Sequence, residues 1–361
     1  MIHSVAMKVC FFLFMLIFAA PAAANPANDT ASSSAAKTVR FAVLGDMPYT
    51  DTEYALLEQP NGAIAKAIRA LNPPVLIHLG DFKKGRLSCS DDLFQDHYRQ
   101  IAQLNPHKTV YTPGDNDWTD CDRFNTGMRH DELERLGYLR QLFFQQDRQQ
   151  LVLDIPGLIR QEGFIENAQW SIGPVAFTTL HIPGTNNGRR EILRSNIDDA
   201  LNEADRRDQA NTGWLQQRFA TAESAQAVVI AFQADMFDFD HEKPVCTASN
   251  RTDCDGFRLL RDLIKQKAEQ FKKPVLIIHG DTAAYCLHQP YPSIPNLWRL
   301  NAPGDYKYID ASLVVFDPEN KDTPFIVTGL LDGKPAPAIC DDNLLSLSRY
   351  IPLQTLKTLL S

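Results

Sequence analysis

Three stretches of the chain share one pattern, a short apolar run that ends in Gly-Asp. They read VRFAVLGD (residues 39–46), VLIHLGD (residues 75–81) and VLIIHGD (residues 275–281). A short apolar run bounded by turn residues is typical of a buried strand, and a glycine at its end lets the backbone turn sharply. In open α/β sheets, ligands bind in the crevice at the carboxyl ends of the strands. The pattern therefore predicts several carboxylates that converge in one crevice.

A fourth segment leads into a dense polar cluster. Residues 109–112 resemble another strand, which continues through Pro113 into Gly114-Asp115-Asn116-Asp117 beside Trp118. Buried carboxylates without partners repel one another, and a divalent cation relieves the repulsion. Oxygen ligands suit hard cations such as Mg, Mn or Ca. An aspartate at the end of a strand also caps turns, and for Asp46 this simpler interpretation stays open.

Length, composition and charge are those of an ordinary globular protein. The 361 residues are 44% hydrophobic and 22% charged, with a formal net charge of −8. This balance argues against a nucleic-acid surface and fits either metal binding or simple solubility. Helical spacing is found at residues 62–71, 91–104, 131–144, 196–219 and 257–271. Further strands are expected at residues 164–170, 175–180, 227–232, 313–316 and 325–327. The alternation predicts an α/β fold with two sheets in one domain and active-site loops at the carboxyl ends of strands.

The N-terminus is typical of a secretory signal peptide. Lys8 precedes an apolar stretch, residues 9–20, that is too short to span a bilayer, and Ala22-Ala23-Ala24 offers a cleavage site. We therefore expect a signal peptide at residues 1–24, a flexible leader at 25–37, and a single domain with a C-terminal extension at 38–361. No later segment is apolar enough for a membrane span. The expected location is secreted or periplasmic.

Six cysteines remain beyond the predicted signal peptide: Cys89, Cys121, Cys246, Cys254, Cys286 and Cys340. An even number in an oxidising compartment favours disulfides, although six cysteines allow many pairings. Their positions favour the pairs Cys89–Cys121, Cys246–Cys254 and Cys286–Cys340. The first pair would tie together the loops that carry Asp81 and Asp115. A zinc–cysteine cluster is the alternative, but the sequence contains no Cys-x-x-Cys motif.

In their order along the chain, these blocks resemble the calcineurin-like metallophosphoesterase family. The resemblance covers residues 39 to about 327 and rests on Gly45-Asp46, Gly80-Asp81, Gly114–Asp117, Phe232-Gln233 and Gly280–Ala283. The wording PGDNDWTDC at residues 113–121 looks like a distinct exported subgroup of that family. The resemblance implies a two-sheet α/β sandwich of the metallophosphoesterase type. It also implies hydrolysis of small-molecule or polymeric phosphate esters by a metal-activated water.

The resemblance gives five residues a metal-binding role. They are Asp46, Asp81, Asp115, Gln233 and Asp281, with Asp81 as the carboxylate that bridges two metals in the family. Gln233 and Asp281 fall where the family has histidine ligands, and alanine occupies the position of a last histidine. Zn and Fe sites prefer nitrogen-rich sets. The nearly all-oxygen set therefore favours Mg, Mn or Ca, bound as one or two ions.

Two residues are candidates for catalysis. Asn116 falls where the family has a catalytic histidine, but an amide cannot transfer a proton as an imidazole does. His279, one residue before Gly280, is the only imidazole that the blocks retain. We therefore expect Asn116 and His279 at the reacting phosphate.

Lys83, Asn186 and Asn187 are candidates for substrate binding. Lys83 follows Asp81 and would attract an anionic ester, and the alternative is a solvated loop lysine. The two asparagines follow the strand that ends at Leu180, and the simpler interpretation there is a surface turn rich in Asn and Gly.

Three interpretations of function remain open. The first is an exported metal-dependent phosphoesterase. The second is a catalytically inactive relative that keeps a cleft for a ligand or partner, because several histidine positions are lost. The third is a structural extracellular domain whose aspartate loops hold one Ca²⁺ for stability.

Overall fold

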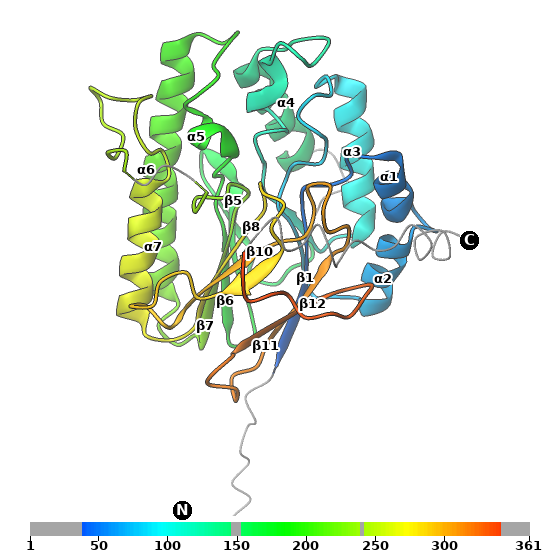
Figure 1. The fold of residues 1–361 in the computed structure, drawn as a ribbon, viewed down its shortest axis with the longest axis vertical. Helices are drawn as coiled ribbons and strands as arrows, with labels where there is room; N and C mark the ends of the chain where they lie inside the picture. Colours follow the sequence, from blue (N-terminus) through cyan, green and yellow to red (C-terminus); the bar gives the residue numbers. More distant parts are fainter. Residues whose placement is uncertain (1–37, 146–152, 239–241, 341–361) are drawn as a thin grey trace, which may run out of the picture. The chain divides into compact units, whose positions relative to one another are not determined.

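Two mixed β-sheets lie face to face, and helices cover the outer face of each. The computed structural model describes residues 38–145, 153–238 and 242–340. Figure 1 shows α6 (Ile197–Thr221) and α7 (Arg258–Phe271) on one side of the strands and α1 (Asp51–Leu57), α2 (Ala63–Leu71) and α3 (Asp91–Leu104) on the other. The predicted α/β fold with two sheets is therefore confirmed.

The first sheet has five strands in the order β12-β11-β1-β2-β3. They are β1 (Val39–Leu44), β2 (Leu76–His78), β3 (Thr109–Tyr111), β11 (Ser312–Phe316) and β12 (Phe325–Gly329). The strands β1, β2 and β3 run parallel, and β11 pairs antiparallel with β1. Because parallel strands end at the same edge, the loops with Asp46, Asp81 and Asp115 leave the sheet together.

The second sheet has seven strands in the order β4-β5-β6-β7-β8-β10-β9. They are β4 (Ile159–Gln161), β5 (Phe164–Ile172), β6 (Val175–Thr179), β7 (Ala227–Ala231), β8 (Val275–His279), β9 (Cys286–His288) and β10 (Leu297–Asn301). The predicted hairpin is confirmed as the antiparallel pair β5–β6. The strands β6, β7, β8 and β10 are parallel, so Gln233 and Asp281 also follow strand ends at one edge.

Several helices begin at a side chain that accepts hydrogen bonds from free backbone amides. Ser90 caps α3, Asp131 caps α4 (Glu132–Phe144), and Asn196 caps α6. Such caps stabilise a helix by about 1 kcal/mol each. Two short turns, η1 (Thr119–Asp122) after β3 and α5 (Gly184–Gly188) after β6, lie in the connecting loops.

The core between the sheets holds the strand ends in place. The ring of Phe41 in β1 meets Phe177 in β6 edge-on, with the centroids 5.1 Å apart, and Trp170 stacks on the same Phe177 at 5.1 Å. On the outer face of the second sheet, Val228 and Ile230 pack within the cluster that α6 and α7 cover. Each fully buried side chain of this kind contributes about 1.5–3 kcal/mol, so the loops at the strand ends have a rigid support.

Several elements of the structure were not predicted, namely α1, α5, η1, β4, β9 and β10, and two of them are instructive. The strand β10 contains Arg299 and Asn301, which interrupt the apolar pattern, yet all five of its residues are buried. Arg299 is accommodated there because Asp235 accepts a hydrogen bond from its Nη2 at 2.7 Å. Thr50 caps the helix α1, because its Oγ1 accepts a hydrogen bond from the Glu53 amide, and the sequence signal is the capping-box spacing Thr-x-x-Glu.

The cysteine pairs confirm the predicted disulfides. The bridges Cys89–Cys121, Cys246–Cys254 and Cys286–Cys340 have Cα–Cα distances of 5.5, 5.0 and 5.2 Å. Three such bridges fit an oxidising compartment. The predicted signal peptide and leader, and residues 341–361 of the predicted C-terminal extension, lie outside the described residues. Within the described part of the chain, every helix is too short or too polar to cross a membrane.

Candidate metal centre

A polar pocket of about 700 Å³ opens at the carboxyl ends of the parallel strands. Six aspartates line it: Asp46, Asp81, Asp115, Asp120, Asp281 and Asp305. The first three follow β1, β2 and β3 of one sheet, and Asp281 follows β8 of the other. Both sheets therefore contribute carboxylates to a single site.

Three of these carboxylates lie close enough to share one cation. Asp81, Asp115 and Asp281 each offer an oxygen, and the three oxygens lie within 4.8 Å of one another. Ca²⁺ binds oxygens at about 2.3–2.6 Å, so two of its ligands are at most about 5 Å apart. The spacing fits a shared divalent ion.

Asp46 adds a fourth carboxylate with an unsatisfied oxygen. Its Oδ1 accepts a hydrogen bond from the Asp281 amide at 3.0 Å. Its Oδ2 is buried and has no hydrogen-bond partner among the described residues. A buried oxygen without a partner is costly, and a cation in the pocket would supply the missing contact.

The backbone is strained at three of the four carboxylates. Asp46, Asp81 and Asp281 have φ values of 52°, 50° and 72°, in the left-handed region that residues other than glycine rarely adopt. Each such residue costs on the order of 1–2 kcal/mol, and strain of this kind concentrates at functional sites. A Cβ on Gly280 would overlap Asp46 Oδ2, so the glycine of this Gly-Asp pair makes room for the neighbouring carboxylate.

Burial and mutual repulsion change the acidity of the site. Burial raises the pKa of Asp46, Asp81 and Asp281 well above the usual aspartate value, and nearby carboxylates raise each pKa further. These groups therefore bind a proton more tightly than an exposed aspartate does. A bound divalent ion would compete with protons for these oxygens.

Gln233 lies in the middle of the carboxylates, with its amide nitrogen facing them. Its Nε2 donates to Asp81 at 2.9 Å, to Asp281 at 3.2 Å and to Asp115 at 3.3 Å. Its Oε1 accepts from the Gly184 amide at 2.8 Å, which fixes the orientation of the side chain. Since an amide nitrogen does not bind a hard cation, Gln233 serves here as a hydrogen-bond donor to the ligands.

Asn116 lines the pocket as expected, and Tyr49 lies beside it. The Asn116 Nδ2 donates to the Tyr49 hydroxyl at 3.0 Å, and the Asn116 amide donates to Asp81 Oδ1 at 3.1 Å. Burial, followed by the neighbouring carboxylates, raises the pKa of Tyr49 well above its usual value. The phenol therefore stays protonated and offers a hydrogen bond to the pocket.

His279 is not brought into the pocket. Its Nδ1 contacts the Gly280 carbonyl at 2.8 Å, and its Nε2 accepts from Arg299 Nε at 2.8 Å. Burial lowers the pKa of His279 to about 4, so the ring is neutral near pH 7. Both nitrogens are occupied in a buried network, which leaves no proton to transfer to a substrate.

The lysine at the pocket is Lys84 rather than Lys83. The side chain of Lys83 is fully buried, and its Nζ has no hydrogen-bond partner among the described residues. Burial lowers its pKa despite the carboxylates nearby, with Asp120 the strongest of them. Lys84, the next residue, lines the pocket. Sequence alone could not tell which of the two lysines faces outward.

Asn186 and Asn187 bind other parts of the protein instead of the pocket. Both are buried in the turn α5, with left-handed φ values of 57° and 59°. Asn186 Nδ2 donates to the Cys254 carbonyl at 3.0 Å, and Asn187 Nδ2 donates to Asp208 at 2.7 Å. The structure therefore fits neither of the two interpretations, substrate binding or a surface turn, because both side chains hold a buried turn in place. That turn presents Thr185, whose hydroxyl donates to Asp115 Oδ2 at 2.9 Å.

The disulfide Cys89–Cys121 lies next to the site, and another cysteine pair is unavailable to metal. Cys89 follows the Asp81 loop, and Cys121 belongs to η1 with the pocket residue Asp120. Cys286 and Cys340 approach His288 closely enough to suggest a metal cluster. Their sulfurs are joined in a disulfide, so they offer no thiolates.

Sequence reasoning missed Asp120 and Asp305. Asp305 follows β10, and its amide donates to the Asp46 carbonyl at 3.0 Å. The signal was present, because Pro303-Gly304-Asp305 repeats the Pro-Gly-Asp order of residues 113–115. It was overlooked because the strand before it is not continuously apolar.

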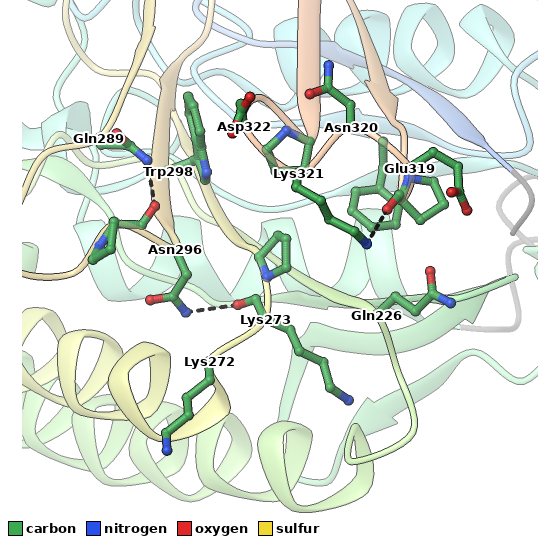
Figure 2. A pocket seen from close by; sticks show the side chains of 15 residues that line it. Gln226, Lys272, Lys273, Gln289, Asn296, Trp298, Glu319, Asn320, Lys321 and Asp322 are labelled. Carbon is green, nitrogen blue, oxygen red and sulfur yellow. Dashed lines mark hydrogen bonds between the residues drawn. The ribbon is translucent and has the colours of Figure 1, made fainter.

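A second cavity of about 740 Å³ lies between the hairpin β11–β12 and the loops that precede β7, β8 and β10. Figure 2 shows Trp298 and the lysines around it. Two of its lysines are engaged in hydrogen bonds within the protein. Lys273 Nζ donates to the Glu223 and Ala225 carbonyls, and Lys321 Nζ donates to the Pro318 carbonyl. This cavity lacks converging carboxylates and is a weaker candidate site.

Comparison with known proteins yields no assignment. No protein-family model matches the chain, and no curated protein matches it.

Proposed function

We propose that this protein is an exported metal-dependent phosphoesterase of the calcineurin-like metallophosphoesterase type. The observation that carries the proposal is the set of four carboxylates, Asp46, Asp81, Asp115 and Asp281, gathered from the strand ends of two sheets. No lysine or arginine side chain forms an ion pair with any of these four among the described residues. The buried, unpartnered Asp46 Oδ2 supports a cation at this place.

These four carboxylates would hold the metal. All their donors are oxygens, which favours Mg, Mn or Ca over Zn or Fe. When bound, such an ion neutralises the phosphate oxygens and acidifies a water for attack on phosphorus. The Gln233 amide nitrogen lies between three of the ligands, which favours one ion over two.

The chain's own donors would orient the ester. The Tyr49 hydroxyl and the side-chain Nδ2 of Asn116 lie 3.0 Å apart in the pocket, and both groups carry protons. They would donate hydrogen bonds to phosphate oxygens as negative charge develops there. No imidazole lines the pocket among the described residues, so the leaving oxygen would take its proton from the Tyr49 phenol or from solvent.

The test is hydrolysis of a chromogenic phosphate monoester and diester with Mg, Mn or Ca after removal of bound metals. We expect metal-dependent turnover that falls by at least about 100-fold in Asp281→Asn, because a ligand oxygen becomes a neutral amide. Lys66→Gln, an exposed substitution on α2, serves as a control and should leave turnover unchanged. A protein that binds none of the metals and hydrolyses no ester would contradict the proposal.

A catalytically inactive binding protein is the alternative, and the position of Gln233 favours it. Its amide nitrogen already donates to three carboxylates, so the acidic cluster is partly satisfied without metal. Calorimetric titration of the metal-free protein with Mn separates the two functions. Binding without turnover on any ester supports the alternative, whereas binding together with turnover supports the enzyme.

A further inference from the structure

Two cationic side chains at the mouth of the acidic pocket have no hydrogen-bond or ion-pair partner in the part of the chain that the structure describes. Lys84 and Arg86 line the pocket, and neither forms a side-chain hydrogen bond or ion pair with the described residues. The third cation there, Arg123, is occupied, because it contacts Asp120 and Glu191. The first two cations are therefore free to bind a ligand.

The loop that carries them is held against the floor of the pocket. Gly85 lies between them, and a Cβ on Gly85 would come within 2.5 Å of Asn116 Oδ1 and 3.0 Å of Asp120 Oδ2. Asn116 in turn donates through its amide to Asp81 Oδ1 at 3.1 Å. The close packing at Gly85 places both cations a short distance from the proposed metal ligands.

The cations lie on the outward side of the loop, and this side is fixed by packing. Lys83, on the inward side, is fully buried, while Lys84 is half-buried and Arg86 is exposed. The acidic residues of the pocket could pair with these cations, yet Asp120 pairs with Arg123. An anion that enters the pocket would meet positive charge at the mouth before it reaches the carboxylates.

We propose that the substrate carries a second anionic group, besides the ester phosphate, and that Lys84 and Arg86 bind that second group. The inference rests on the proposed phosphoesterase function and names its substrate class, a phosphate ester with an additional phosphate or carboxylate. The guanidinium of Arg86 suits a planar or tetrahedral oxyanion, and the ammonium of Lys84 adds a point charge. Tyr49 and Tyr306, whose ring centroids are 4.9 Å apart, provide an apolar wall at the same mouth.

The test compares two esters that differ by one charge, phenyl phosphate and 4-carboxyphenyl phosphate, with the metal-loaded protein. We expect the ratio of kcat/KM values to favour the carboxylated ester by at least about tenfold, since a charged hydrogen bond is formed only there. The double variant K84Q/R86Q should bring this ratio close to one. Added salt should reduce the wild-type ratio, because the contact is near the surface.

A matched control removes one lysine charge and one arginine charge at positions away from the pocket. The double variant R40Q/K66Q changes one exposed arginine on β1 and one exposed lysine on α2, and it should keep the wild-type ratio. Equal rates on both esters in the wild type, or an unchanged ratio in K84Q/R86Q, would overturn the inference and leave the phosphoesterase function standing. If the protein hydrolyses neither these two esters nor the chromogenic esters, both the inference and the phosphoesterase function are contradicted.

Discussion

Two buried aspartates in neighbouring loops, Asp81 and Asp117, have opposite surroundings. Asp117 accepts hydrogen bonds from the amides of Asp81, Phe82 and Gly114 and from the Tyr111 hydroxyl. Asp81 also accepts hydrogen bonds, from the Asn116 amide and from Gln233 Nε2, but it faces other carboxylates as well, and burial and their repulsion raise its pKa. One aspartate therefore organises the loops, whereas the other is held ready for a cation.

This contrast gives a prediction for two isosteric substitutions. In the metal-free protein, Asp117→Asn should lower the free energy of unfolding by about 1–3 kcal/mol, because a side-chain amide has one acceptor oxygen and cannot accept all of the hydrogen bonds that the Asp117 carboxylate accepts. Asp81→Asn should raise the melting temperature, since it removes a repelling carboxylate, while it weakens metal binding. Thermal denaturation with and without chelator measures both. A lower melting temperature for Asp81→Asn would contradict the repulsion that we infer.

At the scale of the loops, the site depends on close approach between segments from different sheets. Gly280, after β8, lies against Asp46, after β1, with no room for a side chain. The Asp281 amide, next in the chain, donates to the same Asp46 carboxylate at 3.0 Å. The two sheets are therefore joined at the pocket by a backbone-to-carboxylate contact.

Adding one methyl group should separate these loops. Gly280→Ala would push its Cβ into Asp46 Oδ2 and should weaken metal affinity by at least about tenfold as the carboxylate moves. The control is Gly137→Ala, an exposed position inside α4 with open space around the added Cβ. It should stabilise the protein by about 0.5–1 kcal/mol through helix propensity and leave affinity unchanged. Calorimetry and denaturation measure the two effects, and equal metal affinities for both variants would argue against a tight junction at Gly280.

The disulfide Cys89–Cys121 should matter for the site as well as for stability. It closes a loop of 32 residues between segments that carry Asp81 and Asp120. Replacing both cysteines with serine should cost about 3–4 kcal/mol by the chain-entropy argument and should also weaken metal binding. Removal of Cys286–Cys340, on the edge strand β9, should lower stability by a similar amount with a smaller loss of affinity. Urea unfolding and calorimetry on both variants check this, and an unchanged affinity without Cys89–Cys121 would count against a role for it at the pocket.

At the scale of the whole molecule, the balance of buried acids predicts how stability depends on pH. A group whose pKa is raised by folding keeps a proton that the unfolded chain releases, so its contribution is present at low pH and is lost as the pH rises through the folded pKa. Burial raises the pKa of Asp310 to about 7 and that of Glu132 to about 9, and the pocket aspartates shift in the same direction. Lys83, with a lowered pKa, acts in the opposite direction but is a single group.

Between about pH 7 and pH 9 the free energy of unfolding without metal should therefore fall chiefly through Glu132, because the contribution of Asp310 is largely lost by pH 7. Histidines with lowered pKa values, such as His279 at about 4, do not affect this range, because the unfolded imidazole is neutral above about pH 6.5. Saturating Mn should reduce the fall, since bound carboxylates stay ionised throughout. Urea unfolding at several pH values, with metal and with chelator, measures this. A stability that rises with pH in chelator would contradict the prediction.

Local patterns in the sequence determined most strands, most helices and the positions where carboxylates follow strands. These features depend on neighbours in the chain: apolar runs, capping residues and Gly-Asp turns act over a few residues. The convergence of Asp46, Asp81 and Asp115 was predictable for the same reason, because parallel strands end at one edge of a sheet. Asp305 was within reach, since its Pro-Gly-Asp signal is also local.

Only the tertiary structure decided which way individual side chains face. Packing turned Lys83 inward and Lys84 outward, and it placed the nitrogen of Gln233 toward the carboxylates because the Gly184 amide holds its oxygen. It also buried Asn186 and Asn187 in a left-handed turn. These outcomes depend on contacts between residues far apart in the chain. A single hydrogen-bond donor, or a lack of space for a side chain, decides the orientation there, and no local sequence pattern carries that information.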